Sequence, residues 1–322
     1  MWDSTQGPRG WVAREENDGV APPRVAHPGR ATASAALVGA TAVWGSTFVV
    51  TKSSLDELAP ATFLAWRFGV AAVVLLAVTL RRTLALRRED VRRALGVGVL
   101  LGSGFLLQTT GLQHTSAGLS GFLTGSSVVM VPLVASVVFG HDVPRTGWVA
   151  AGLSAAGLVL LTSGPGGAVT AGALVTLLGA GCFAGHITSL GEWATPTNAV
   201  GLTTVSVAVA AVLCALAAVV ADGPRVPPSA AAWSSVLYVA LVATCVGLAV
   251  QAWAQSALSA VTAAVIMTME PVFAAVLAIG VGGESLTPAA WVGGVVVVAA
   301  MGVAELGARE CCDVASPRVE CC

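Results

Sequence analysis

One acidic residue, Glu270, lies in the middle of the stretch AAVIMTMEPVFAAVLAIG (263–280), which is apolar apart from Thr268. A carboxylate at the centre of a lipid bilayer costs about 2.5–3.5 kcal/mol on insertion scales. The neighbouring Pro271 lacks a backbone N–H and frees a carbonyl that lipid cannot satisfy. We therefore expect Glu270 to face protein or water. Three roles fit it: proton coupling, binding of a substrate amine, or a structural hydrogen bond between helices.

Hydroxyl and amide side chains recur at helical spacing in other apolar stretches. The hydroxyl stripe consists of Ser116, Ser120, Thr124 and Ser127. A second polar stripe consists of the amides Gln251 and Gln255 and the hydroxyl of Ser259, and Gln108 adds a further amide. Close helix packing explains any single Ser, whereas a whole stripe favours a cavity wall. Buried amides must face protein or water, so Gln108 and Gln251 fit a substrate contact or a bond between helices equally well.

Three further residues complete the candidates. Trp44 could stack on a substrate ring or simply pack, His186 could line the path or carry protons, and Thr262 shares a helical stripe with Glu270. Arg67 lies about 10 Å inside its apolar stretch, counting 1.5 Å per residue, and we interpret it as a structural anchor. The predicted substrate site is Trp44, Gln108, Ser120, Thr124, Ser127, His186, Gln251, Gln255, Thr262 and Glu270, with Glu270 as the proton-coupling group.

The composition shows what kind of element holds these residues. The chain has 322 residues, of which 56% are hydrophobic and 10% charged, whereas a soluble domain has roughly 25% charged residues. Apolar runs of the length that spans a bilayer fall near 33–52, 60–80, 91–112, 115–139, 144–163, 169–190, 199–220, 232–257, 261–281 and 287–307. The sequence thus predicts an all-α polytopic membrane protein with ten transmembrane helices.

The distribution of Lys and Arg predicts the orientation. Ten of the sixteen lie in the first 30 residues and in 81–93. We interpret this as an orientation signal in a cell-membrane protein and not as nucleic-acid binding. With the amino terminus inside, thirteen fall on the cytoplasmic side and only Lys52 and Arg225 outside. Both termini are therefore predicted to be cytoplasmic.

Both ends of the chain have the composition of tails. Residues 1–32 are polar and rich in Pro and Gly, so we expect a disordered tail and no removed signal peptide. Residues 308–322 form a second tail with two Cys-Cys pairs, CCDVASPRVECC. The pairs lack CxxC spacing and a nearby His, so we predict neither a metal site nor a cofactor.

A shift of 143 residues aligns the chain with itself. Gln108 then meets Gln251, and Trp148–Val149 meets Trp291–Val292. The two halves, 33–163 and 169–307, each hold five predicted spans. Because five is odd, the halves would have opposite orientations, an arrangement found in secondary transporters. Ser127 is the counterpart of Glu270, so the predicted site has one acid at this depth.

Several segments in order resemble one known family. They are WGSTFVVTKSSL, LAWRF, LQHTSAGLSGFLTGSSVVMVPLV and MEPVFAAVLAIGVGGESLTPAAWVGGVVVVAAMGV. Their sequence and spacing are similar to the EamA-type transporters of the drug/metabolite transporter superfamily, over about residues 34–305. The resemblance implies ten helices, inverted repeats, cytoplasmic termini and a central cavity formed by spans 1, 3, 4, 6, 8 and 9. Members mostly export small metabolites, including amino acids, or take up nutrients.

We therefore expect a secondary transporter, and not an enzyme, that exports a small polar or amphipathic metabolite by alternating access. The expected partners are the small-molecule substrate and the lipid bilayer; no nucleic acid is expected, and a homodimer is left open. One alternative is an intramembrane serine protease, because GLSG (118–121) matches the GxSG pattern and His186 could act as a base. The other is a membrane receptor or scaffold without transport.

Overall fold

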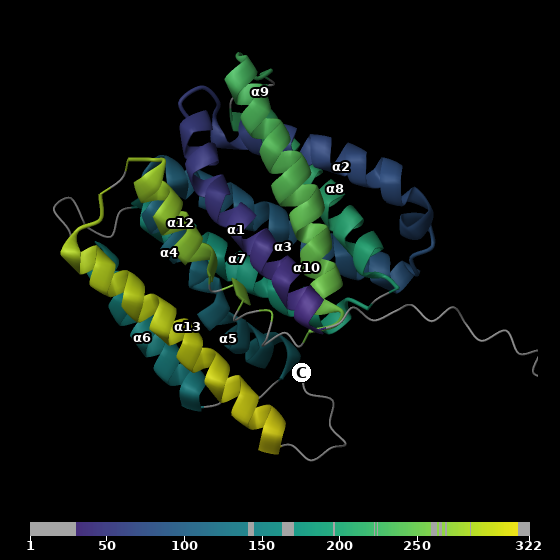
Figure 1. Ribbon diagram of the computed structural model, residues 1–322. Helices are drawn as coiled ribbons and strands as arrows, with labels where there is room; N and C mark the ends of the chain where they lie inside the picture. The colour runs from purple at the N-terminus through teal and green to yellow at the C-terminus, as the bar shows by residue number, and fades with distance from the viewer. Residues whose placement is uncertain are drawn as a thin grey trace, which may run out of the picture.

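The computed structural model describes residues 30–140, 145–162, 171–195, 197–221, 223, 225–258, 263, 266–267, 269–283 and 285–314. All regular secondary structure within these residues is helical (Figure 1). The helices are α1 (Arg30–Ser54), α2 (Pro60–Leu84), α3 (Arg88–Gln113), α4 (Ala117–Gly125), α5 (Ser127–Phe139), α6 (Arg145–Thr162), α7 (Ala171–Trp193), α8 (Ala199–Ala221), α9 (Ala230–Leu237), η1 (Tyr238–Val246), α10 (Gly247–Gln255), α12 (Met269–Gly280) and α13 (Pro288–Val314).

Fewer membrane spans can be counted among the described residues than the sequence predicts for the whole chain. Six described helical stretches are long and apolar enough to cross a bilayer, and seven if one bent pair counts as a single span. The bent pair, Ala117–Val131 with Leu133–Phe139, covers the predicted span 115–139 and bends by 45°. Apolar pieces at Trp148–Gly157, Met269–Gly280 and Pro288–Ala300 are shorter. The all-helical class is confirmed, whereas the count of ten helices is not.

Two predicted spans are interrupted for reasons visible in the sequence. The bend in the first falls at Pro132, where the ring removes a helical N–H donor and crowds the preceding turn. The second predicted span, 232–257, corresponds to the helical stretch Ala230–Gln255, which begins as α9, widens into the π-helical segment η1, and continues as α10. A π-helical turn shifts the hydrogen-bond register by one residue and is frequent at functional sites.

Both ends of the helical region extend beyond the sequence expectation. α1 begins at Arg30, inside the predicted tail 1–32, whose remaining residues lie outside the described part. α13 continues to Val314, through the first half of the predicted tail 308–322. Its final turns, AELGARECCDV (304–314), contain good helix formers and no proline. The helix α13 therefore continues beyond the end of the apolar run.

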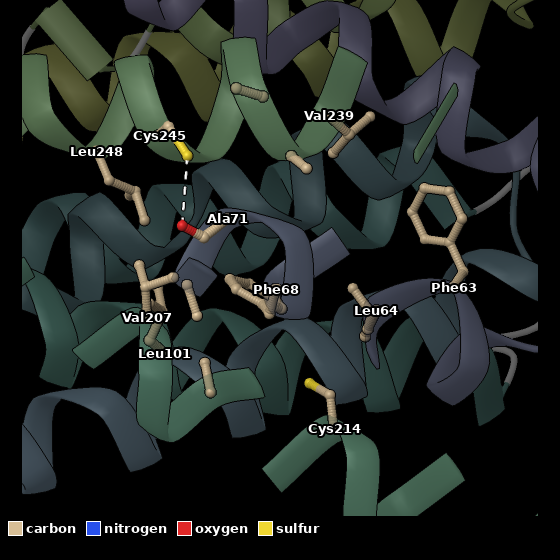
Figure 2. Packing of buried hydrophobic residues seen from close by; sticks show 14 of the residues in the cluster. Phe63, Leu64, Phe68, Ala71, Leu101, Val207, Cys214, Val239, Cys245 and Leu248 are labelled. Carbon is tan, nitrogen blue, oxygen red and sulfur yellow. Dashed lines mark hydrogen bonds between the residues drawn. The ribbon is translucent and has the colours of Figure 1, made fainter. Parts of the chain in front are cut away.

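Helices from the two halves of the chain pack against each other. α6 and α13 lie side by side along their length, and α2 packs on α8 and α3 on α7 (Figure 1). The main buried cluster joins α2, α3, α8 and the η1–α10 region. Figure 2 shows Phe68, Leu101, Val207 and Leu248 of this cluster, and the Cys245 thiol, which donates to the Ala71 carbonyl oxygen at 3.6 Å.

The 143-residue shift found in the sequence also relates local features of the structure. α6 begins at Arg145 and α13 at Pro288, which are 143 residues apart. Gly140, after α5, has a φ of 74°, and Gly283, after α12, has a φ of 65°. Only glycine adopts this left-handed conformation at little steric cost, so matching positions after the matching helices share one unusual backbone conformation.

The contact between α1 and α12 depends on a glycine. A Cβ atom at Gly45 would lie 2.6 Å from the Phe273 Cβ and 2.9 Å from the Ala274 backbone nitrogen. The backbones therefore approach at a distance that excludes a methyl group. Gly39, on the same helix, has no atom within 4 Å of its Cβ position.

We predict that Gly45→Ala lowers the melting temperature of the detergent-solubilised protein, because α1 and α12 must separate and overpacking costs about 1–3 kcal/mol. Gly39→Ala is the matched control and should not lower it, since the site is open and Ala is the better helix former. Thermal denaturation followed by size-exclusion chromatography measures both. Equal melting temperatures for the two variants would show that the close approach is absent.

Candidate functional site

A cavity of about 580 Å³, a volume that includes its open mouth, lies among helices from both halves of the chain. The residues that line it are Trp44, Thr47, Phe48, Arg67, Leu101, Phe105, Gln108, Thr124, Ser127, Phe183, His186, Ile187, Leu248, Gln251, Met267 and Glu270. Small-molecule sites in proteins are typically concave and largely apolar. The wall is largely apolar and carries a few polar groups, as such sites usually do.

One cation and one acid face this cavity. Arg67 of α2 is buried, with 3% of its surface exposed, and Glu270 of α12 is half-buried. The Arg67 Nε donates to the Thr244 hydroxyl at 2.9 Å, and its guanidinium carbon lies 4.1 Å from the centre of the Phe105 ring. Within the described part of the chain the two charged groups form no ion pair with each other or with another residue. Each is therefore available to a third group in the cavity.

The π-helical segment η1 positions two cavity residues. Thr244, whose hydroxyl receives the Arg67 hydrogen bond, itself donates to the Val239 carbonyl five residues earlier at 2.9 Å. The Trp44 indole donates to the Ala243 carbonyl at 2.8 Å. η1 thus supplies both polar partners, which fix the side chains of α1 and α2 against the second half of the chain.

Glycine allows this contact with Trp44. A Cβ at Gly247, the first residue after η1, would lie 2.6 Å from the Trp44 Nε1. A larger residue there would therefore push the indole away from its acceptor.

Amide and hydroxyl groups from the two halves meet at the cavity wall. Gln108 of α3 donates through Nε2 to the Thr124 hydroxyl of α4 at 2.9 Å. Gln251 of α10, its counterpart in the 143-residue shift, is 2% exposed, and its amide makes no hydrogen bond within the described residues. Ser127 of α5 and Glu270 of α12 are also counterparts. The cavity wall therefore holds both members of each pair, and its two sides differ in chemistry.

His186 lies where the main cavity adjoins a smaller one of about 220 Å³. The two share Leu101, His186, Leu248 and Gln251, and the smaller one continues toward Leu190. The His186 Nδ1 is 3.4 Å from the Val97 carbonyl, while its buried Nε2 has no partner in the described chain. His186 and Gln251 thus line both spaces.

Comparison with known proteins assigns the family. The EamA-like transporter family matches residues 32–163 and again 170–304. The chain belongs to the EamA-like transporter family. The resemblance noted in the sequence is thereby confirmed, and the two matched regions agree with the two-repeat architecture. The protein is a multi-pass membrane transporter and not an enzyme.

Other transporters are similar over most of their length. An uncharacterized transporter of Archaeoglobus fulgidus is 27% identical over 264 residues, which are 82% of each chain. The uncharacterized inner membrane transporter YedA of Escherichia coli is 26% identical over 280 residues, 84% of this chain and 90% of YedA. One crystal structure matches with a TM-score of 0.63 and 19% identity, over 88% of this chain and 99% of the other. That likeness concerns the fold alone.

The structure brings most of the predicted site residues of this EamA-like transporter together. Seven of the ten line the cavity: Trp44, Gln108, Thr124, Ser127, His186, Gln251 and Glu270. Thr262 lies outside the described residues. The described residues contain no group of three His, Cys, Asp or Glu side chains that could hold a metal ion.

Two predicted site residues are not part of the cavity wall. Ser120 is fully buried, and Gln255 is partly buried with both amide atoms enclosed; none of these polar atoms has a described hydrogen-bond partner. Both residues have the helical spacing of the polar stripes from which they were predicted to line the cavity. Ser120, however, lies beside Gly121, where α4 packs so closely on α12 that a Cβ would be 2.6 Å from the Ala274 Cβ. Near Ser120, this face of α4 therefore packs against α12 and does not line the cavity.

Sequence reasoning missed several lining residues. Arg67 was interpreted as an anchor, whereas its side chain both anchors to Thr244 and lines the cavity. The rings of Phe48, Phe105 and Phe183 gave no signal, because an apolar side chain in a transmembrane helix has the same type whether it faces lipid or a cavity. The π-helical register of η1 likewise has no sequence signature.

We predict different thiol reactivity for two cysteines placed on one stripe. In a background whose native cysteines are replaced, Ser127→Cys should react at least about tenfold faster with a small hydrophilic thiol reagent than Ser120→Cys, because reactivity requires access to water. Ser127 lines the cavity and Ser120 does not. Labelling followed by mass spectrometry measures both rates. Similar rates would mean that the cavity boundary is drawn wrongly.

Proposed function

We propose that this EamA-like transporter is a secondary transporter that exports a small polar or amphipathic metabolite. The observation that carries the proposal is the cavity of about 580 Å³, in which an acid, a cation and two amides from both halves face one space. Polar and ionisable groups are expensive inside a membrane and usually mark a substrate or ion path. Neither lipid packing nor a purely structural role explains so many of them around one cavity.

Alternating access is the mechanism that this arrangement supports best. In the proposal, ten spans form two five-helix repeats, 33–163 and 169–307, of opposite orientation, which rock about the shared site. The equal spacing of the α6 and α13 starts and of Gly140 and Gly283 supports the repeat. The interruption at Ser126, directly before Ser127, supports a site at a broken helix, as in other transporters with inverted repeats.

The proposed orientation puts both termini in the cytoplasm of a cell-membrane protein. Arg87 and Arg93 at the start of α3 contact Asp90 and Glu89, the latter pair at 2.5 Å. At the other end of α3, Lys52 donates to the Leu112 carbonyl at 2.7 Å, a favourable contact for a cation at a helix carboxyl end. The proposed inner end of α3 therefore carries the excess of Arg, as the positive-inside rule requires. A homodimer stays a prediction.

Glu270 is the proposed proton-coupling residue. Its carboxyl group faces the cavity and makes no hydrogen bond within the described residues, so a proton can bind or leave without breaking a structural contact. A structural Glu, in contrast, would be held by a neighbouring helix. Binding of a substrate amine at Glu270 is the remaining alternative, and it would also depend on the acid.

The protease alternative is not favoured by the geometry. The Ser120 hydroxyl has no described hydrogen-bond partner and is absent from the cavity wall, whereas His186 lies in that wall. A nucleophilic Ser needs a base within hydrogen-bond reach. A serine-reactive fluorophosphonate should therefore fail to label the protein. A receptor or scaffold without transport would not require a cavity shared by both repeats.

The substrate and the direction of transport can be measured together in cells. We predict that a deletion strain accumulates one or a few metabolites inside the cell, and that overexpression moves the same compounds to the medium. Mass spectrometry of intracellular and extracellular extracts compares the two strains with the parent. Accumulation in the medium of the deletion strain would instead indicate uptake.

Glu270→Gln tests the coupling. We predict that the variant inserts and folds normally but loses proton-driven flux in proteoliposomes and its dependence on pH, because an amide cannot carry the proton. Glu57→Gln is the control: Glu57 is an exposed acid whose Oε2 accepts from the Ser229 hydroxyl at 2.6 Å, a bond that an amide oxygen can retain. Unchanged flux and pH dependence in Glu270→Gln would remove the coupling role.

A further inference from the structure

We propose that Arg67 is the anion-binding group of the cavity, and that the substrate is a small organic carboxylate with an apolar or aromatic body. The inference rests on the proposed transport function and specifies the substrate class of the same site. It also gives Arg67, which the sequence alone indicates as an anchor, a direct contact with the substrate.

The first argument is the unbalanced charge. Arg67 lies within a span, 3% exposed, and its guanidinium stays charged at neutral pH. Glu270 interacts with it electrostatically, but no carboxylate in the described part of the chain lies within ion-pair distance of it. Leaving a buried charge without a partner is strongly destabilising. The cavity is the space from which a counter-charge can reach this group, so a bound anion would complete it.

The second argument is that the known contacts use only part of the guanidinium. The Nε donates to Thr244, and the rings of Phe105 and Phe68 lie 4.1 and 5.1 Å from the guanidinium carbon. These contacts hold the group in one orientation. Within the described residues the two terminal nitrogens make no hydrogen bond. A purely structural Arg would use its terminal nitrogens; here they remain available.

The shape of the group matches a carboxylate. A guanidinium is planar and presents two parallel N–H donors, which bind both oxygens of a carboxylate at once. Because Thr244 and the two rings fix its position in advance, little side-chain freedom is lost on binding.

The rest of the wall suits an apolar body. Phe48, Phe105, Phe183, Leu101, Leu248 and Met267 contribute rings and aliphatic chains around the polar groups. Glu270 and His186 are the other titratable groups in the wall, so a substrate amine, if present, would meet Glu270. Simple organic acids and amino acids share the carboxylate that Arg67 binds.

The test compares two nearly isosteric probes, 3-phenylpropionate and its neutral amide, 3-phenylpropanamide. Calorimetry with the purified full-length protein in a neutral detergent measures both affinities. We expect the carboxylate to bind at least about tenfold more tightly, as one charge-assisted pair implies. Equal affinities, or no binding of either probe, would overturn the proposal without the need for any variant.

Variants assign the preference to the residue. Arg67→Gln should abolish the preference for the carboxylate, and Arg67→Lys, which keeps the charge but not the paired donors, should retain part of it. Arg225→Gln is the matched control, because Arg225 is exposed and only its backbone carbonyl is used, by the Trp66 indole at 2.7 Å. A preference that survives in Arg67→Gln would place the anion site elsewhere and contradict the proposal.

Two further comparisons distinguish the sources of the carboxylate and the possible failures. Tighter binding of phenylalanine than of 3-phenylpropionate, lost in Glu270→Gln, would identify an amino-acid substrate; equal or weaker binding would identify a simple organic acid, and both agree with the role of Arg67. Proteoliposome flux is measured separately with the metabolites found in cells. Flux without a carboxylate preference would reject the role of Arg67 and leave the transport function standing.

Discussion

The interior of a bilayer offers no water, so every polar group in this protein needs a partner that the protein or its substrate supplies. Most of the buried polar groups meet this requirement in pairs, such as Gln108 with Thr124 and Trp44 with the Ala243 carbonyl. Arg67 and Glu270 do so incompletely, and both face the same cavity. Ser120 and Gln255 also lack described partners outside the cavity, but they are neutral. The two charged groups without an ion pair therefore distinguish the cavity from the packed regions around it, and the functional argument depends on them.

The fold creates the cavity by interrupting helices instead of leaving a gap between regular ones. The segment η1 departs from the α-helical register and offers Ala243 and Thr244 to residues of α1 and α2. The break between α4 and α5 brings Ser127 to the wall, which Glu270 of α12 also lines. Irregular backbone at membrane depth is tolerated where it is buried in protein or lines a cavity. The η1 segment holds Trp44 and Arg67 of the cavity wall, and the break at Ser126 precedes Ser127 of the same wall, which links the irregular backbone to the site.

The sequence predicts the all-helical class and the family. It also predicts several residues that line the cavity, because a polar side chain within an apolar run has a high free energy in lipid and must therefore face protein or water. Glu270, Gln108 and Gln251 are expensive in lipid, so their presence in apolar runs indicates a polar environment. The same rule is ambiguous for hydroxyls: Ser120 and Ser127 share a stripe, yet one packs beside Gly121 and the other lines the cavity. The helical period predicts which face of a helix a residue lies on. It does not predict which residues along that face line a cavity and which pack against another helix. The aromatic wall and the register of η1 depend on tertiary packing alone, and Arg67 has two roles where the sequence indicated one.

The most direct measurement of the central claim is counterflow in liposomes that contain only the purified protein. Vesicles are loaded with a metabolite that the deletion strain retains, and entry of the labelled compound is followed without ATP. The account predicts saturable entry that depends on the internal load, since one cavity serves both sides in turn. Entry no faster than in protein-free liposomes, or entry that requires ATP or a second protein, would contradict it.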